Sequence, residues 1–146
     1  MNKGTFVLQL GPYGGNFARV DENRKDAMVI VMSEGDEKGR RWVLEPTDHG
    51  TCTLRNQKTG TYLTFEGEPH VNKPGCTGDA REWELRAFSG PLMGNFHLVV
   101  PGGQVEGEEL VFDASALRIF PPQTALRPIR PSDMAQTWML KRVTED

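Results

Sequence analysis

Gly4-Thr5-Phe6-Val7-Leu8 is the stretch that decides the fold, because it is repeated twice further along the chain. It recurs as Gly50-Thr51-Cys52-Thr53-Leu54 and as Gly94-Asn95-Phe96-His97-Leu98, at steps of 46 and 44 residues. Each unit also ends on a tryptophan that stands two residues before a leucine. All three tryptophans of the chain are used in this way: Trp42, Trp83 and Trp138. A fixed period of this size indicates supersecondary units that bury their apolar faces against one another.

Within each repeated stretch, bulky residues alternate with polar ones, which is the pattern of a half-buried β-strand. The first unit has four such segments, separated by turns rich in Gly, Pro, Asn and Asp. They are Thr5 to Leu10, Asn16 to Val20, Ala27 to Met32 and Trp42 to Glu45. Three units of four strands predict an all-β fold. By fold analogy this is a β-trefoil, a six-stranded barrel with a hairpin cap, whose repeats cover about residues 1–48, 49–92 and 93–146.

Length and charge restrict the classes of protein that the chain can belong to. A chain of 146 residues fits one domain with a sizeable core. Its net charge of −3 and pI near 5.6 argue against nucleic acid as a partner. No apolar run is long enough to span a bilayer, so no membrane partner is expected. Met1-Asn2-Lys3 leads directly into the first strand without a signal peptide, which predicts a cytoplasmic monomer that could act after release.

The two cysteines occupy different kinds of position. Cys52 stands in the slot that Phe6 and Phe96 fill in the sister units, so its side chain is expected in the core. Cys76 lies in the loop-like stretch Lys73-Pro74-Gly75-Cys76-Thr77-Gly78. Because a disulfide needs Cβ atoms within about 4.5 Å, we predict two free thiols rather than a bridge.

No group of residues in the sequence predicts catalysis. The histidines, His49, His70 and His97, have no metal-ligand spacing, and His97 alternates with two apolar neighbours, so it is expected to face solvent. Gly11-Pro12-Tyr13-Gly14-Gly15 joins two strands, whereas phosphate-binding and dinucleotide-binding loops lead into a helix. The sequence therefore predicts no catalytic residue, no metal and no cofactor, and a protein that is not an enzyme.

Four stretches of the chain resemble the small mushroom β-trefoil protease inhibitors. This family includes the cysteine-protease inhibitors clitocypin and macrocypin and the trypsin inhibitor cospin. The stretches that carry the resemblance are Gly4-Thr5-Phe6-Val7-Leu8, Gly14-Gly15-Asn16-Phe17, Arg41-Trp42-Val43-Leu44 and Trp138-Met139-Leu140-Lys141-Arg142-Val143. The resemblance implies a protein that inhibits a target protease through an exposed loop, without cofactors.

In the trypsin-inhibiting branch, the resemblance implies a reactive site between the second and third strands. That loop is Asp21-Glu22-Asn23-Arg24-Lys25-Asp26 in this sequence. Trypsin-like proteases select a basic P1 side chain, so Arg24 is the first candidate and Lys25 the second, with Asn23 beside them. A loop held rigid by a barrel loses little entropy on docking. The alternative interpretation is that six charged or polar residues only make a soluble turn.

The other branches of the resemblance point to different loops. Papain-like proteases would be blocked by the first hairpin, where Gly14 and Gly15 let the backbone approach an active site closely. Glycines in a hairpin are also ordinary turn residues. An asparagine-specific protease, legumain, would make Asn56 the residue to test, although the hairpin Asn56-Gln57-Lys58-Thr59-Gly60 can be purely structural.

A carbohydrate-binding lectin is the alternative from a different class. Many trefoil lectins carry Gln-x-Trp near the end of each repeat, and Gln136-Thr137-Trp138 matches this motif once. Arg40 and Arg81 replace the glutamine in the other two repeats. A sugar site also needs an exposed aromatic ring beside a hydrogen-bonding acid, and Tyr13 and Phe120 are the aromatics outside the predicted core. A role as a structural interaction protein is a third interpretation.

Overall fold

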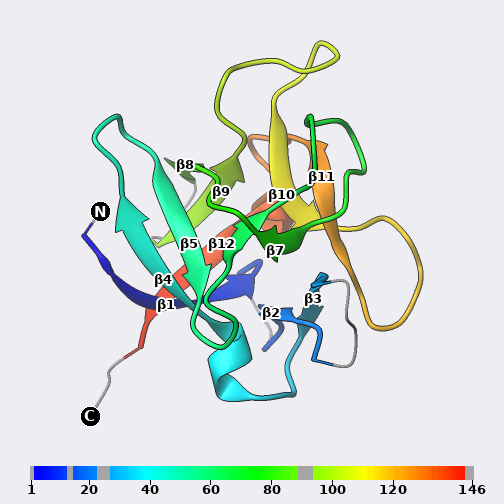
Figure 1. The fold of residues 1–146 in the computed structure, drawn as a ribbon. Coiled ribbons are helices and arrows are strands. Elements are labelled where there is room, and N and C mark those ends of the chain that lie inside the picture. Colours follow the sequence, from blue (N-terminus) through cyan, green and yellow to red (C-terminus); the bar gives the residue numbers. More distant parts are fainter. Residues whose placement is uncertain (1, 13–14, 23–26, 89–93, 144–146) are drawn as a thin grey trace.

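The computed structural model describes residues 2–12, 15–22, 27–88 and 94–143 (Figure 1). These residues form twelve β-strands and two short 3₁₀ turns, η1 (Glu37–Arg40) and η2 (Met134–Gln136). The strands are β1 (Gly4–Leu10), β2 (Phe17–Val20), β3 (Val29–Met32), β4 (Arg41–Pro46), β5 (Cys52–Asn56), β6 (Tyr62–Thr64), β7 (Cys76–Gly78), β8 (Glu84–Ala87), β9 (Asn95–Val99), β10 (Leu110–Ala114), β11 (Thr124–Pro128) and β12 (Trp138–Arg142). The four strands predicted for the first unit are confirmed to within two residues at each end.

Six of the strands form a closed barrel. β1 pairs antiparallel with β12 and β4, β4 pairs with β5, and β9 pairs with β8 and β12. The ring closes between β5 and β8, where the backbones of Cys52 and Trp83 exchange two hydrogen bonds of 2.9 and 2.8 Å. Closure of the ring leaves the barrel without a free sheet edge.

The remaining strands form three hairpins that close one end of the barrel: β2–β3, β6–β7 and β10–β11 (Figure 1). Each hairpin touches the next through an isolated β-bridge. The bridges pair Met28 with Cys76, Pro74 with Ala125, and Ile30 with Gln123. A six-stranded barrel capped by three mutually bridged hairpins is the β-trefoil that the repeats predict.

The repeated tryptophans explain the threefold pattern. Their side chains are fully buried, and each indole N–H donates to a backbone carbonyl in the hairpin of its own repeat. The bonds are Trp42 to Ala18 at 3.0 Å, Trp83 to Leu63 at 3.0 Å and Trp138 to Phe112 at 2.8 Å. Each indole therefore fills the core with its apolar ring and links the barrel to a hairpin through its one N–H group.

The cysteines differ from their prediction in one respect. Cys52 lies in the core as expected, with 3% of its surface exposed. Cys76 is not in a loop: it begins β7, where it pairs with Thr64 of β6 and is buried. The turn-forming residues before Cys76 hid this short strand from sequence analysis. The two cysteines do not form a disulfide.

The helical content is confined to short turns. Asp36 caps η1 by accepting a hydrogen bond from the Lys38 backbone N–H at 2.9 Å, and Asp133 caps η2 in the same way through Ala135 at 3.0 Å. Among the described residues, no helix has the length and apolar character needed to cross a membrane.

Candidate functional site

The tryptophan bonds define one equivalent position in each repeat. The residue that follows the carbonyl acceptor is polar in all three: Arg19, Thr64 and Asp113. The residue two places before the tryptophan comes from the same repeat: Arg40, Arg81 and Gln136. The threefold frame thus supplies three comparable sites, and each repeat fills its site with different chemistry.

The third repeat combines an acid with the glutamine of the Gln-x-Trp motif. Gln136 Nε2 donates to Asp113 Oδ2 at 3.2 Å and to the Pro128 carbonyl at 2.8 Å. Gln136 Oε1 accepts from the Arg130 backbone N–H at 2.7 Å, and Asp113 Oδ1 accepts from Ala114 N–H at 2.7 Å. Every polar atom of the glutamine is engaged, so its amide fixes the acid and the segment that follows β11.

A cation lies over this acid. Arg130 Nη2 is 3.9 Å from Asp113 Oδ2, and Arg130 Nε donates to Asp133 Oδ2 at 2.8 Å. Burial raises the pKa of Asp113 above its ordinary value, whereas the hydrogen bond from Arg130 lowers the pKa of Asp133. We call Asp113, Arg130, Asp133 and Gln136 the Asp113 cluster. It places a carboxylate acceptor beside a half-exposed guanidinium donor.

The second repeat presents a polar hollow of about 410 Å³ at the equivalent place. Arg81 Nε donates to Thr64 Oγ1 at 2.8 Å, and its guanidinium lies 3.8 Å from the centre of the Phe65 ring. Glu66 and Asp79 line the same hollow, and both are exposed. This hollow therefore brings two carboxylates and an arginine together.

The first repeat buries its charge instead of presenting it. Arg19 is 2% exposed, and its guanidinium donates to the carbonyls of Met32 at 3.4 Å and Asp36 at 3.2 Å. Burial, reinforced by nearby Arg40, lowers the pKa of Arg19. The hollow at this position measures only about 100 Å³. The first repeat therefore offers less room for a ligand than the second.

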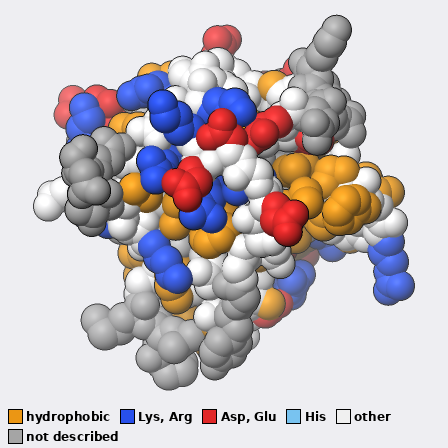
Figure 2. Space-filling view, turned by 90° about the horizontal axis from the view of Figure 1, so that it is seen from below, with side chains coloured by type: hydrophobic (Ala, Val, Ile, Leu, Met, Phe, Trp, Pro, Cys, Tyr) orange, Lys and Arg blue, Asp and Glu red, His pale blue; other side chains and the backbone are white. Residues whose placement is uncertain are grey.

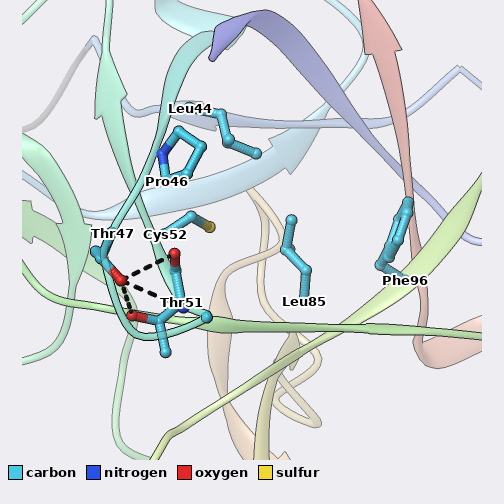
Figure 3. Close-up of a pocket in the computed structure, with 8 residues that line it drawn as sticks. Leu44, Pro46, Thr47, Thr51, Cys52, Leu85 and Phe96 are labelled. Carbon is cyan, nitrogen blue, oxygen red and sulfur yellow. Dashed lines mark hydrogen bonds between the residues drawn. The ribbon is translucent and has the colours of Figure 1, made fainter. Parts of the chain in front are cut away.

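A separate hollow of about 350 Å³ lies between the β4–β5 turn and strands β8 and β9 (Figure 3). Leu85 and Phe96 face Cys52 across it, and the hydroxyls of Thr47 and Thr51 lie 2.8 Å apart at its rim. Burial raises the pKa of Cys52 to about 11, so the group in the hollow is a neutral thiol and a poor nucleophile at neutral pH. Within the described ranges, no three His, Cys, Asp or Glu side chains converge to hold a metal ion.

Most of the predicted protease-binding residues lie outside the described residues: Asn23, Arg24 and Lys25 of the reactive loop and Gly14 of the Gly-Gly loop. Tyr13, one of the two aromatics singled out for a sugar site, is also outside them. Gly15 is exposed, and a Cβ built on it would meet nothing within 4 Å. Asn56 is fully buried, and it bonds to the backbone of its own turn and of η1. Gly15 and Asn56 thus differ in exposure, since Gly15 is open to solvent and Asn56 is enclosed.

His97 is a correction to the sequence analysis. It was expected to face solvent, but it is 2% exposed. Its ring centroid lies 6.1 Å from that of Phe88. The backbone of Arg130, a residue much further along the chain, also contacts the ring. Burial lowers the pKa of His97. Alternation correctly placed His97 on the outer side of β9, but segments that are distant in the sequence cover that side of the strand.

Sequence reasoning also missed Asp113 and Arg130. A signal was present, since Val111-Phe112-Asp113 of the third repeat corresponds to Phe17-Ala18-Arg19 of the first. Placing the two hairpins in register would have put an acid next to the one Gln-x-Trp motif. Arg130 had no such signal, because its position depends on the path of the chain after β11.

Comparison with solved structures shows the same fold over the full chain. The Macrolepiota procera ricin B-like lectin in complex with lactose is 20% identical, covers 98% of both chains and has a TM-score of 0.79. The Rhizoctonia solani agglutinin is 16% identical, covers 98% of this chain and 97% of its own, and has a TM-score of 0.78. The designed threefold-symmetric ThreeFoil is 17% identical, covers 96% and 99%, and has a TM-score of 0.76. No family model and no curated protein matches the sequence. The chain is a β-trefoil.

Proposed function

We propose that this protein binds carbohydrate through the Asp113 cluster. The observation that carries the proposal is the carboxylate of Asp113, held by Gln136 beside the guanidinium of Arg130. Neighbouring sugar hydroxyls donate and accept at the same time, so a fixed acceptor next to a donor suits a vicinal diol. The structural similarity to a lectin and an agglutinin supports this reading over protease inhibition.

The chemistry of Asp113 supports the assignment. Because the pKa of Asp113 is raised in the folded state, ionisation of this acid lowers the free energy of unfolding. Its contribution to stability is full below its ordinary pKa and is lost as pH rises through the folded-state pKa. Hydroxyl donors of a bound sugar would add to the hydrogen bonds from Gln136 and the Ala114 N–H, which already replace part of the hydration that this buried carboxylate loses.

The first test compares the wild-type protein with the variants Asp113→Asn and Arg130→Ala. For each, binding to lactose and to the glycans of an array is measured. We expect each substitution to weaken glycan binding at least about tenfold, the factor given by loss of one charge-assisted hydrogen bond. Asp48→Ala is the matched control, because Asp48 is an exposed acid in the β4–β5 turn. Binding should also fall as pH drops past the raised pKa of Asp113, since a protonated carboxyl loses acceptor strength.

Melting curves separate loss of the site from loss of the fold. Arg130 is exposed on the surface, so Arg130→Ala should melt like the wild type even if Asp113→Asn does not. Wild-type protein that binds no glycan, or an Asp113→Asn variant with native affinity, would refute the proposal.

A second proposal, inhibition of a trypsin-like protease, rests on the loop that begins at Asp21. The described residues on either side of the loop are joined by a 2.9 Å hydrogen bond from Asp21 N–H to the Met28 carbonyl. We expect Arg24→Ala to reduce trypsin inhibition at least about a hundredfold, because the basic P1 group would be lost. Lys141→Ala, at an exposed lysine of β12, is the control. The residual activities of trypsin, papain and legumain measure the effect. If the wild-type protein inhibits none of these three enzymes, this proposal is excluded.

A further inference from the structure

Every exposed large hydrophobic side chain in the described part of the molecule lies on one loop. Leu117 is 63% exposed, Ile119 47% and Phe120 82%, and all three belong to residues 115–123 between β10 and β11. Figure 2 shows hydrophobic side chains gathered at one side of the face that it presents. Scattered exposed apolar residues are ordinary on a protein surface, but a cluster confined to a single loop marks a contact site.

The loop is held firmly at its base. Ser115 N–H donates to the Gln123 carbonyl at 2.8 Å, and Val31 N–H donates to the Pro122 carbonyl at 2.9 Å. Leu117 N–H donates to Ser115 Oγ at 3.2 Å, which fixes the chain where the loop leaves β10. The loop projects from the body of the molecule beyond the hairpin cap (Figure 1). Its apolar side chains are thus presented to the outside on an ordered support.

Charge and shape narrow the possible partners. Residues 115–123 include Arg118 and no Asp or Glu, although the whole chain carries a net charge of −3. A convex loop of this kind needs a deep complementary cavity in a protein, whereas a bilayer interface admits it without a preformed site. A second copy would have to accept the loop in one of its surface hollows, such as the one between the β4–β5 turn and β9, and a head-to-tail contact of that kind forms rings or open chains.

We propose that the 115–123 loop inserts into the interfacial region of a lipid bilayer. Phe120, Leu117 and Ile119 enter the boundary between headgroups and acyl chains, and Arg118 stays at the level of the lipid phosphates. This is contact with one leaflet, not a membrane span. The inference does not require sugar binding, because it uses none of the residues of the Asp113 cluster.

Phe120→Trp provides a direct test, because the three native tryptophans are fully buried. Vesicles of phosphatidylcholine alone, or mixed with phosphatidylserine, should shift the emission of the new tryptophan to shorter wavelength, and brominated phosphatidylcholine should quench it. Thr59→Trp, an exposed site in the β5–β6 turn, should show neither effect. The vesicles carry no sugar, so binding to them cannot come from the Asp113 cluster.

Two substitutions measure the separate contributions in vesicle sedimentation. Phe120→Ala should lower the partition coefficient about tenfold, since one aromatic ring no longer enters the interface. Arg118→Ala should reduce the preference for phosphatidylserine about fivefold and leave binding to phosphatidylcholine unchanged. Unchanged emission of Phe120→Trp with every vesicle would overturn the proposal. So would concentration-dependent association in sedimentation velocity that Phe120→Ala abolishes, because the occupant would then be another copy.

Discussion

Trp83→Ala should lower the free energy of unfolding by about 3–5 kcal/mol, a large part of the 5–15 kcal/mol typical of a domain. The ring of Trp83 is fully buried, with edge-to-face contacts to Phe65 at 5.9 Å and to Phe112 at 5.8 Å. Its backbone also closes the barrel against Cys52. The substitution leaves a cavity beside Phe65 and Phe112 inside a closed barrel, which limits how far the core can collapse into it. Chemical denaturation followed by circular dichroism measures the loss.

Conservative variants separate the ring from its hydrogen bond. Trp83→Phe keeps most of the apolar volume but leaves the Leu63 carbonyl without its indole donor, at a cost of about 1–2 kcal/mol. Because the same bond occurs in each repeat, Trp42→Phe and Trp138→Phe should cost similar amounts. A Trp83→Ala loss below about 1 kcal/mol would contradict the role of the tryptophans as core anchors.

The architecture was predictable because it depends on local pattern copied three times. Alternation identified the strands, and the three copies of the opening stretch, each followed later by a Trp-x-Leu, identified the repeats. Both signals lie within a few residues of sequence. The exact strand ends shifted by one or two residues in both directions, since strand pairing decides where a ladder begins and ends.

The candidate site was less predictable because it depends on contacts between distant segments. Gln136 was noticed through its motif, but its partner Asp113 is 23 positions away and Arg130 comes from the connection to η2. The burial of His97 has the same cause, since Phe88 and the Arg130 backbone cover it. Phe120 was correctly expected to lie outside the core, and the structure places it on a projecting loop.

The three repeats show how one frame can carry different surfaces. Equivalent positions hold a buried arginine, a threonine under a stacked arginine, and an acid fixed by an amide: Arg19, Thr64 and Asp113. The backbone and the tryptophan bond stay the same in each case. Substitution at these positions therefore changes the local chemistry while the tryptophan bond is kept, and the third repeat also carries the apolar loop of residues 115–123.

Asn56→Ala should destabilise the protein by about 2 kcal/mol, because it removes three hydrogen bonds from a fully buried side chain. Asn56 Nδ2 donates to the Gly39 carbonyl at 2.9 Å, and Oδ1 accepts from the N–H groups of Lys58 at 3.0 Å and Thr59 at 3.2 Å. The side chain thus ties η1 to the β5–β6 turn. Asn2→Ala, at an exposed position, is the control and should leave the unfolding curve unchanged.

The same residue separates a structural role from protease recognition. An asparagine-specific protease must take the amide into its pocket, and in the folded protein that amide is already bonded on both sides. We therefore expect legumain to leave the bond after Asn56 intact, as judged by mass spectrometry, while Asn56→Ala lowers the melting temperature by several degrees. Cleavage after Asn56 in the native wild type, or a variant with normal melting that loses legumain inhibition, would show that the turn opens to present this side chain.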